Sequence, residues 1–219
     1  MGTKYVTLND RLYEYLLSSR SDLADPLLGE LRAETAKLGD VSVCQISDDQ
    51  GAFLSILVAA IGARTALEVG TFTGYSSICI ARSLPPEGRL ICLDQSKEWT
   101  DVARRYWAKA GVQDRIDLRL GDALTHLRQL EPSLTFDFVF IDADKTQYEA
   151  YYEMILPRVR RNGLILFDNM LWAGKLGNGP IQEATGRAID ALNQKLPHDP
   201  RVETVLLSVA DGIQFCRKR

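Results

Sequence analysis

The spacing of apolar residues divides the chain into two parts that meet near residue 65. In the first part the spacing is helical, with one apolar face over residues 8–17. A second helix is predicted after Asp25-Pro26, since an acid followed by proline is typical of a helix start, and Gly39 ends its apolar run. A third predicted helix, 49–61, is apolar on most sides, so we expect it to be largely buried.

In the second part, short β-branched or apolar runs alternate with helical spacing. The runs predicted as strands are 65–69, 89–94, 116–120, 136–142 and 164–168. This alternation indicates βαβ units, and hence a mainly parallel sheet covered by helices on both faces. Two last runs, 202–208 and 213–217, are joined by a short turn that contains Asp211-Gly212, which predicts an antiparallel hairpin.

Together these elements predict an α/β fold. We expect a seven-stranded, mostly parallel sheet with an antiparallel C-terminal hairpin, helices on both faces and extra N-terminal helices. A chain of 219 residues without repeats or linkers is expected to form a single domain over residues 1–219. Within it, N-terminal helices over 1–62 precede an alternating α/β core over 63–219.

Composition and charge narrow the function classes. The chain is 46% hydrophobic and 25% charged, which excludes a disordered or fibrous protein. Its net charge is −3 and it has no basic run, so we expect neither a nucleic-acid nor a membrane partner. Its longest apolar run, 53–61, is too short to span a bilayer. Four cysteines without a C-x-x-C pair suit a reducing compartment, and we expect a soluble, cytoplasmic protein.

Polar residues at the predicted strand ends deserve most weight, because open parallel sheets bind ligands there. A glycine-rich loop, Gly70 to Gly74, follows the first strand and allows close approach of a ligand. It is neither a Walker loop nor G-x-G-x-x-G, and a plain tight turn stays possible. Asp94, which ends the second strand, has the position of an acid that binds ribose hydroxyls. Glu68 adds a negative charge beside this loop, which disfavours a pyrophosphate. A positively charged nucleoside such as S-adenosylmethionine fits better.

A second polar cluster follows two later strands. Asp142 and Asp168 lie 26 residues apart, the length of one βαβ crossover, with Asn169 and Lys145 beside them in the sequence. Neighbouring strands would bring the two carboxylates together, which is unfavourable unless a cation lies between them. Oxygen donors without histidine or thiolate suit magnesium, and also manganese or calcium, rather than zinc. The alternative is that each acid only caps the helix that follows it.

Several segments of the sequence together resemble a known family. The segments that carry the resemblance are 47–54, 67–76, 140–145, 168–172 and 211–213. With these motifs the chain resembles the cation-dependent class I O-methyltransferases of the caffeoyl-CoA O-methyltransferase type, and more distantly catechol O-methyltransferase. The resemblance covers nearly the whole chain and implies a Rossmann-like fold.

The resemblance also implies roles for individual residues. The implied cofactor-binding residues are Ile46, Glu68, Gly70, Thr71, Ser76, Asp94, Ala123, Asp142 and Asp144. The implied ligands of the divalent cation are Asp142, Asp168 and Asn169, the implied catalytic residues are Lys145 and Asp142, and the implied substrate contacts are Asp142 and Trp172. Trp172 could equally be a core or interface aromatic.

Two residues depart from the family pattern. Ile46 stands where relatives often have threonine, which removes a side-chain hydrogen bond to the cofactor. Ala173 stands where plant relatives have asparagine near the substrate, which puts strict caffeoyl-CoA specificity in question. The acceptor classes that remain are catechols, caffeic acid, its coenzyme A ester and flavonoids. We also expect a homodimer, as is usual for such relatives, because Trp99, Tyr106 and Trp107 would offer excess aromatic surface.

The implied chemistry is methylation of one hydroxyl of a vicinal dihydroxyaromatic molecule. A divalent cation that binds both oxygens stabilises the phenolate, and a lysine can take the departing proton. Three other functions compete with it. The chain lacks the G-x-G-x-x-G motif of a nicotinamide-dependent oxidoreductase. A modifier of protein or RNA and a non-catalytic nucleoside-binding module would use the same fold as the methyltransferase.

Overall fold

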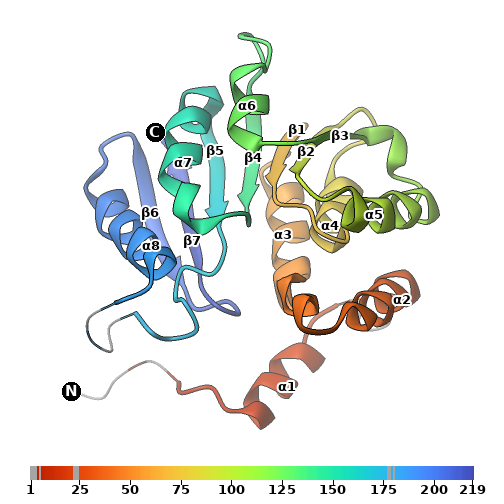
Figure 1. Ribbon diagram of the computed structural model, residues 1–219, viewed down its shortest axis with the longest axis horizontal. Coiled ribbons are helices and arrows are strands. Elements are labelled where there is room, and N and C mark those ends of the chain that lie inside the picture. Colours follow the sequence, from red (N-terminus) through yellow and green to blue (C-terminus); the bar gives the residue numbers. More distant parts are fainter. Residues whose placement is uncertain (1–3, 5, 22–24, 177–178, 180) are drawn as a thin grey trace.

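A single seven-stranded sheet organises the molecule (Figure 1). The computed structural model describes residues 4, 6–21, 25–176, 179 and 181–219. The strand order is β3-β2-β1-β4-β5-β7-β6, and β7 runs antiparallel to both of its neighbours while the other pairs are parallel. The strands are β1 Thr65–Val69, β2 Arg89–Asp94, β3 Ile116–Leu120, β4 Phe136–Ile141, β5 Val159–Phe167, β6 Val202–Leu207 and β7 Ile213–Lys218. The predicted fold class, including the antiparallel C-terminal hairpin, is confirmed.

Helices cover both faces of the sheet (Figure 1). One face carries α6 Ala123–Arg128, α7 Tyr148–Ile155 and α8 Ala184–Lys195, and the other carries α2 Pro26–Thr35, α3 Asp48–Ala60, α4 Tyr75–Ser83 and α5 Lys97–Lys109. Helix α1 Asp10–Ser18 contacts α3 but has no buried residue. The short helices are η1 Ala36–Cys44, η2 Gln113–Arg115, η3 Lys145–Gln147, η4 Leu156–Arg158 and η5 Leu196–His198. Among the described residues, no helix has the length and apolar character needed to cross a membrane.

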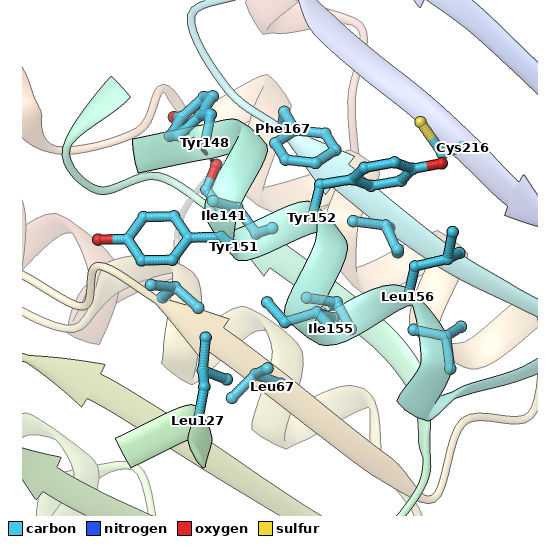
Figure 2. Packing of buried hydrophobic residues seen from close by; sticks show 14 of the residues in the cluster. Leu67, Leu127, Ile141, Tyr148, Tyr151, Tyr152, Ile155, Leu156, Phe167 and Cys216 are labelled. Atoms are coloured by element: carbon cyan, nitrogen blue, oxygen red, sulfur yellow. Dashed lines mark hydrogen bonds between the residues drawn. The ribbon is translucent and has the colours of Figure 1, made fainter. Parts of the chain in front are cut away.

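Tyrosines fill much of the core beneath α7 (Figure 2). Tyr148, Tyr151 and Tyr152 are almost completely buried, and the rings of Tyr148 and Tyr152 lie against Phe167 of β5. The Tyr148 hydroxyl donates to the carbonyls of Ile141 and Asp168, both at 3.2 Å. Because these carbonyls end β4 and β5, one core side chain fixes the spacing of the two strand ends that carry polar residues.

The N-terminal helices begin as predicted but end differently. Asp25 Oδ1 accepts the backbone N–H groups of Leu27 and Leu28, and Pro26 follows as the first helical residue. The α-helix ends at Thr35, and the chain continues as the 3₁₀ segment η1, in which Gly39 has a φ of 72°. The glycine therefore bends this segment instead of ending the α-helix directly.

Two expectations about burial were wrong. Helix α3 buries only Gln50, Gly51, Leu54 and Val58, and Ile56 is 67% exposed, because no described element covers its outer side. The aromatic residues of α5 do not form a surface patch. Tyr106 and Trp107 are 0% and 2% exposed, and Trp99 packs its ring edge-on against Phe72 at 5.0 Å. The aromatic surface that we expected to support a dimer is therefore absent from α5.

Candidate active site

A cavity of about 1010 Å³ opens where the parallel strands β1, β2, β4 and β5 end. Its floor includes Val69, Leu93, Asp142 and Asp168, which lie at or just after these strand ends. The N-terminal segment 43–47 and the turn residues Ala210 and Asp211 line it from other directions. The cavity therefore lies at the sheet edge where the sequence predicted a ligand.

The glycine-rich loop forms one wall of the cavity and depends on Gly70. This residue has a φ of 90°, and a Cβ atom there would lie 2.0 Å from the carbonyl oxygen of Asp142. Gly74 also has a φ of 90° and begins α4. The loop thus crosses the end of β4 at backbone contact, which brings the predicted nucleoside-binding loop and the predicted metal-binding residues together.

Asp94 holds this loop through backbone hydrogen bonds. Its Oδ2 atom accepts the N–H groups of Thr71 and Phe72, both at 2.8 Å, and its Oδ1 atom accepts the N–H of Ser96 at 2.8 Å. The sequence predicted only a ribose contact for this carboxylate. In the structure it also fixes the loop, and Oδ1, which accepts one N–H group, keeps a lone pair for a ligand.

Glu68 is completely buried beneath the same loop. Its Oε1 atom has no hydrogen-bond partner, and neither has Oγ1 of Thr71. The contact to Oε2 is a weak one from the Cys92 thiol at 3.4 Å. Burial is the largest influence on Glu68 and raises the pKa of its carboxyl to about 8. Two buried polar atoms without partners, one of them acidic, suit a ligand that brings a cationic donor.

The remaining predicted cofactor residues also reach the cavity. Ile46, Ser76, Ala123 and Asp144 all line it. The carboxylate of Asp144, however, already accepts the N–H and hydroxyl of Thr146 and the amide of Gln147, so it caps η3. Asp144 is therefore a helix cap as well as a lining residue of the cavity.

The predicted metal-binding residues meet at the floor of the cavity. Asp142, Asp168, Asn169 and Lys145 all line it. Lys145 donates from Nζ to Oδ1 of Asp142 at 2.6 Å. Asn169 has a φ of 59°, a left-handed conformation that asparagine tolerates and that turns the chain immediately after β5.

Asp168 is the most perturbed carboxyl of this group. It is 3% exposed, and burial together with the charge of Asp142 raises its pKa to about 7. Among the described residues, no group of three or more His, Cys, Asp or Glu side chains forms a metal site. The donor set is two carboxylates and one amide. Hard oxygen donors and a strained pair of acids fit Mg²⁺ or Mn²⁺, whose charge would relieve the repulsion.

Trp172 also lines the cavity. It has a φ of 51°, its Nε1 donates to Glu183 at 3.2 Å, and Lys175 lies 5.5 Å from its ring centre. The indole is half-buried and lines the cavity. It is therefore available as a wall for a flat ligand, and the substrate contact that the resemblance implied stays a prediction.

The sequence missed the residues that attach the N-terminal segment to the site. Gln45 donates to the hydroxyls of Thr35 and Thr73, so it ties η1 to the glycine-rich loop. Asp48 accepts hydrogen bonds from Arg20, Arg32 and Tyr75, which join the first four helices.

Gln50, also missed, contacts the metal-binding group directly. It donates to Asp168 at 2.8 Å across 118 residues of sequence. Two signals were available: Gln50 lies in the motif segment 47–54, to which no role was assigned, and Ser47-x-x-Gln50 is typical of a capping box, which does form here.

Comparison with known proteins identifies this architecture. The chain superimposes on an O-methyltransferase from Bacillus cereus in complex with SAH, with a TM-score of 0.87 and 31% identity over 95% of this chain and 97% of that one. It is equally similar, with a TM-score of 0.87 and 26% identity, to the O-methyltransferase TomG of Streptomyces achromogenes, whose structure contains SAM, over 97% and 99% of the two chains. The sheet order and the cavity at its edge therefore define a class I methyltransferase fold.

Sequence comparison then gives the family. A family model described as O-methyltransferase matches residues 18–219, and the chain belongs to this family. It is 37% identical to caffeoyl-CoA O-methyltransferase of Eucalyptus gunnii over 100% of this chain and 91% of that protein. It is 36% identical to tricin synthase 1 of Oryza sativa subsp. japonica over 98% and 90%. The resemblance stated from the motifs is confirmed, and the protein is an O-methyltransferase.

Proposed function

We propose that this protein transfers a methyl group from S-adenosylmethionine to one hydroxyl of a vicinal dihydroxyaromatic molecule, with the help of a divalent cation. The observation that carries the proposal is the group of Asp142, Asp168, Asn169 and Lys145 at the floor of a cavity that also contains the glycine-rich loop. The cofactor assignment is supported by the buried, unpartnered Glu68 and by relatives whose structures contain SAM or SAH.

The cofactor would lie along the glycine-rich loop. Asp94 would accept hydrogen bonds from its ribose, and Ala123 would contact its adenine. Glu68 would face its ammonium group, with Gly70, Thr71 and Ser76 around the methionine part. Ile46 would contribute only apolar contact. S-Adenosylmethionine supplies an electrophilic methyl group on a sulfonium.

Asp142, Asp168 and Asn169 would hold the cation. A divalent cation bound there would lower the pKa of two adjacent phenolic hydroxyls and fix their orientation. Lys145 donates from Nζ to Asp142 at 2.6 Å, so it is an ammonium here and would first have to give up a proton, once the cation occupies Asp142 in its place. Its free Nζ would then take the hydroxyl proton. As the oxygen–methyl bond forms, the sulfur–methyl bond breaks, and S-adenosylhomocysteine leaves. Trp172 would pack against the aromatic ring of the acceptor and hold it in line with the methyl group.

An acceptor series tests the proposed function. With Mg²⁺ and cofactor present, catechol, caffeic acid, caffeoyl-CoA and a flavonoid with adjacent hydroxyls would each be compared with the matching monohydroxy compound. We expect methylation only of the dihydroxy members, since only these can bind one cation through two oxygens. Equal rates for the two members of a pair would contradict the chelation that the proposal requires.

Two finer proposals concern assembly and location. A homodimer would cover apolar side chains such as Tyr15 and Ile56, which are 66% and 67% exposed. Light scattering that gives the 24.5 kDa of one chain at micromolar concentration would contradict a dimer. A cytoplasmic location is supported by Cys79, Cys92 and Cys216, which are free and buried. Secretion of the expressed protein in fractionation experiments would contradict this location.

A further inference from the structure

Gln50 is the only side chain of the N-terminal half found to bond to the proposed metal-binding group within the described residues. It lies on α3 and is 3% exposed. Its Nε2 atom donates to Oδ1 of Asp168 at 2.8 Å, a buried hydrogen bond to a carboxylate. Such charge-assisted bonds are stronger than those between neutral groups.

The other end of the Gln50 amide is fixed as well. Its Oε1 atom accepts the backbone N–H of Ser47 at 3.0 Å and the Ser47 hydroxyl at 3.1 Å. The bond from the Ser47 backbone is enough to determine which end of the amide faces Asp168, because it occupies the oxygen and only the NH₂ group can then point to the carboxylate. Gln50 therefore presents a preoriented donor.

Asp168 receives two donors on the same oxygen. Besides Gln50, the backbone N–H of Asn169 donates to Oδ1 at 2.7 Å. Among the described residues, no hydrogen bond reaches Oδ2. Two donors on Oδ1 fix the plane of the carboxylate and leave Oδ2 for the cavity, where Asp142 and Asn169 also lie.

From this geometry we infer that Gln50 is a positioning residue for the divalent cation, which it serves by orienting the carboxylate of Asp168. The inference rests on the proposed function, because it needs a cation at Asp168. Residues that orient a metal ligand typically change metal affinity 10–100-fold when they are removed. Among the described residues, no hydrogen bond joins Gln50 to Glu68 or Asp94 on the cofactor side of the cavity, so the effect should be confined to the metal.

The test measures Mn²⁺ affinity by electron paramagnetic resonance or calorimetry on the full chain. Gln50→Met keeps the length of the side chain but cannot donate, and Gln50→Leu serves as a second variant of similar size. We expect each to weaken Mn²⁺ binding by about 10–100-fold. Affinity for S-adenosylhomocysteine should stay within about threefold of the wild type. In the methyltransferase assay, the Mn²⁺ concentration for half-maximal rate should rise while the rate at saturating Mn²⁺ recovers.

Two control variants separate positioning from simple stability. Gln194→Met removes another glutamine–aspartate bond, to Asp190 at 2.9 Å on exposed α8. Ser47→Ala removes a bond to Oε1 of Gln50 and leaves the bond of Nε2 to Asp168 intact. Both should leave Mn²⁺ affinity within about twofold of the wild type.

The outcomes distinguish this inference from the proposed function. If wild type binds Mn²⁺ and both Gln50 variants bind it equally well, the positioning role is wrong and the proposed function stands. If Ser47→Ala weakens Mn²⁺ binding as much as Gln50→Met, the effect belongs to the helix cap and the inference is again overturned. If the folded wild type binds no Mn²⁺ at all, both the inference and the proposed cation dependence fail.

Discussion

Cofactor binding should depend on pH through Glu68. With the cavity empty, burial raises the pKa of this carboxyl to about 8, so Glu68 is mostly protonated at pH 7. An arriving ammonium group needs the carboxylate, and ionising Glu68 first costs about 1.4 kcal/mol at pH 7. The affinity should therefore fall as the pH falls. For a group with a pKa of 8 that must ionise completely, the expected loss is about 50-fold between pH 8 and pH 6.

Neighbouring groups do not change this expectation. The thiols that face Glu68 are Cys92 and Cys79, and burial raises the pKa of each well beyond pH 8. The charge of Asp142 also raises the pKa of Glu68. Calorimetry with S-adenosylhomocysteine at pH 7, in two buffers with different ionisation enthalpies, should detect release of about 0.9 proton.

The variant Glu68→Gln isolates this effect from every other titrating group, including the ligand's own amine. An amide does not ionise, so the variant should bind more weakly at pH 8, and its affinity should change far less toward pH 6. The two affinity curves should converge at low pH. Parallel curves for wild type and variant would refute the reasoning, because Glu68 would then not be the group that ionises on binding.

Three further variants test the walls of the cavity. Gly70→Ala should lower the free energy of unfolding by about 1–3 kcal/mol more than Gly62→Ala, because Gly62 shares the positive φ but has open space around it. Equal denaturant midpoints for the two variants would contradict this. Lys145→Ala should slow the chemical step by about 10²–10⁴-fold and keep cofactor affinity; an unchanged single-turnover rate would exclude it as proton acceptor. Asp94→Ala should cost at least about 1.5–3 kcal/mol of cofactor affinity, since the loop also loses its support, and unchanged calorimetric affinity would show that Asp94 is not at the ribose.

The sheet was predictable because its strands carry their own pattern. The short apolar runs 65–69 and 89–94 predicted the observed bounds of β1 and β2, and the terminal turn predicted the antiparallel hairpin. Strand β5 begins at Val159, five residues earlier than predicted. Its first part contains Asn162 with a φ of 62° and a register shift against β4, and such irregular pairing leaves no period-2 pattern in the sequence.

Burial was harder to predict than secondary structure. The apolar helix α3 contains both Val58, which is 0% exposed, and Ile56, which is 67% exposed. Both are β-branched apolar residues, and only the position of neighbouring helices decides which of them is covered. In the same way, the sequence did not show that Tyr106 and Trp107 turn inward.

The candidate site was predictable only as far as it depends on strand ends. Asp142 and Asp168 meet at one cavity, as the crossover length indicated. The hydrogen bond from Gln50 to Asp168 joins residues 118 apart in the sequence, and Asp94 accepts hydrogen bonds from backbone N–H groups. Neither kind of contact has a sequence pattern of its own, because backbone donors are common to nearly all residues and the packing of α3 against the sheet edge is set by the whole fold.

Cation dependence is the central claim, and metal-free protein tests it most directly. The measurement is methyl transfer from labelled S-adenosylmethionine to catechol by chelator-treated protein that has been shown to bind S-adenosylhomocysteine, before and after Mg²⁺ is added. We predict no transfer above background without metal and restored transfer with Mg²⁺ or Mn²⁺, because only the cation can hold both hydroxyls between Asp142, Asp168 and Asn169. Full activity of the metal-free protein would contradict the account.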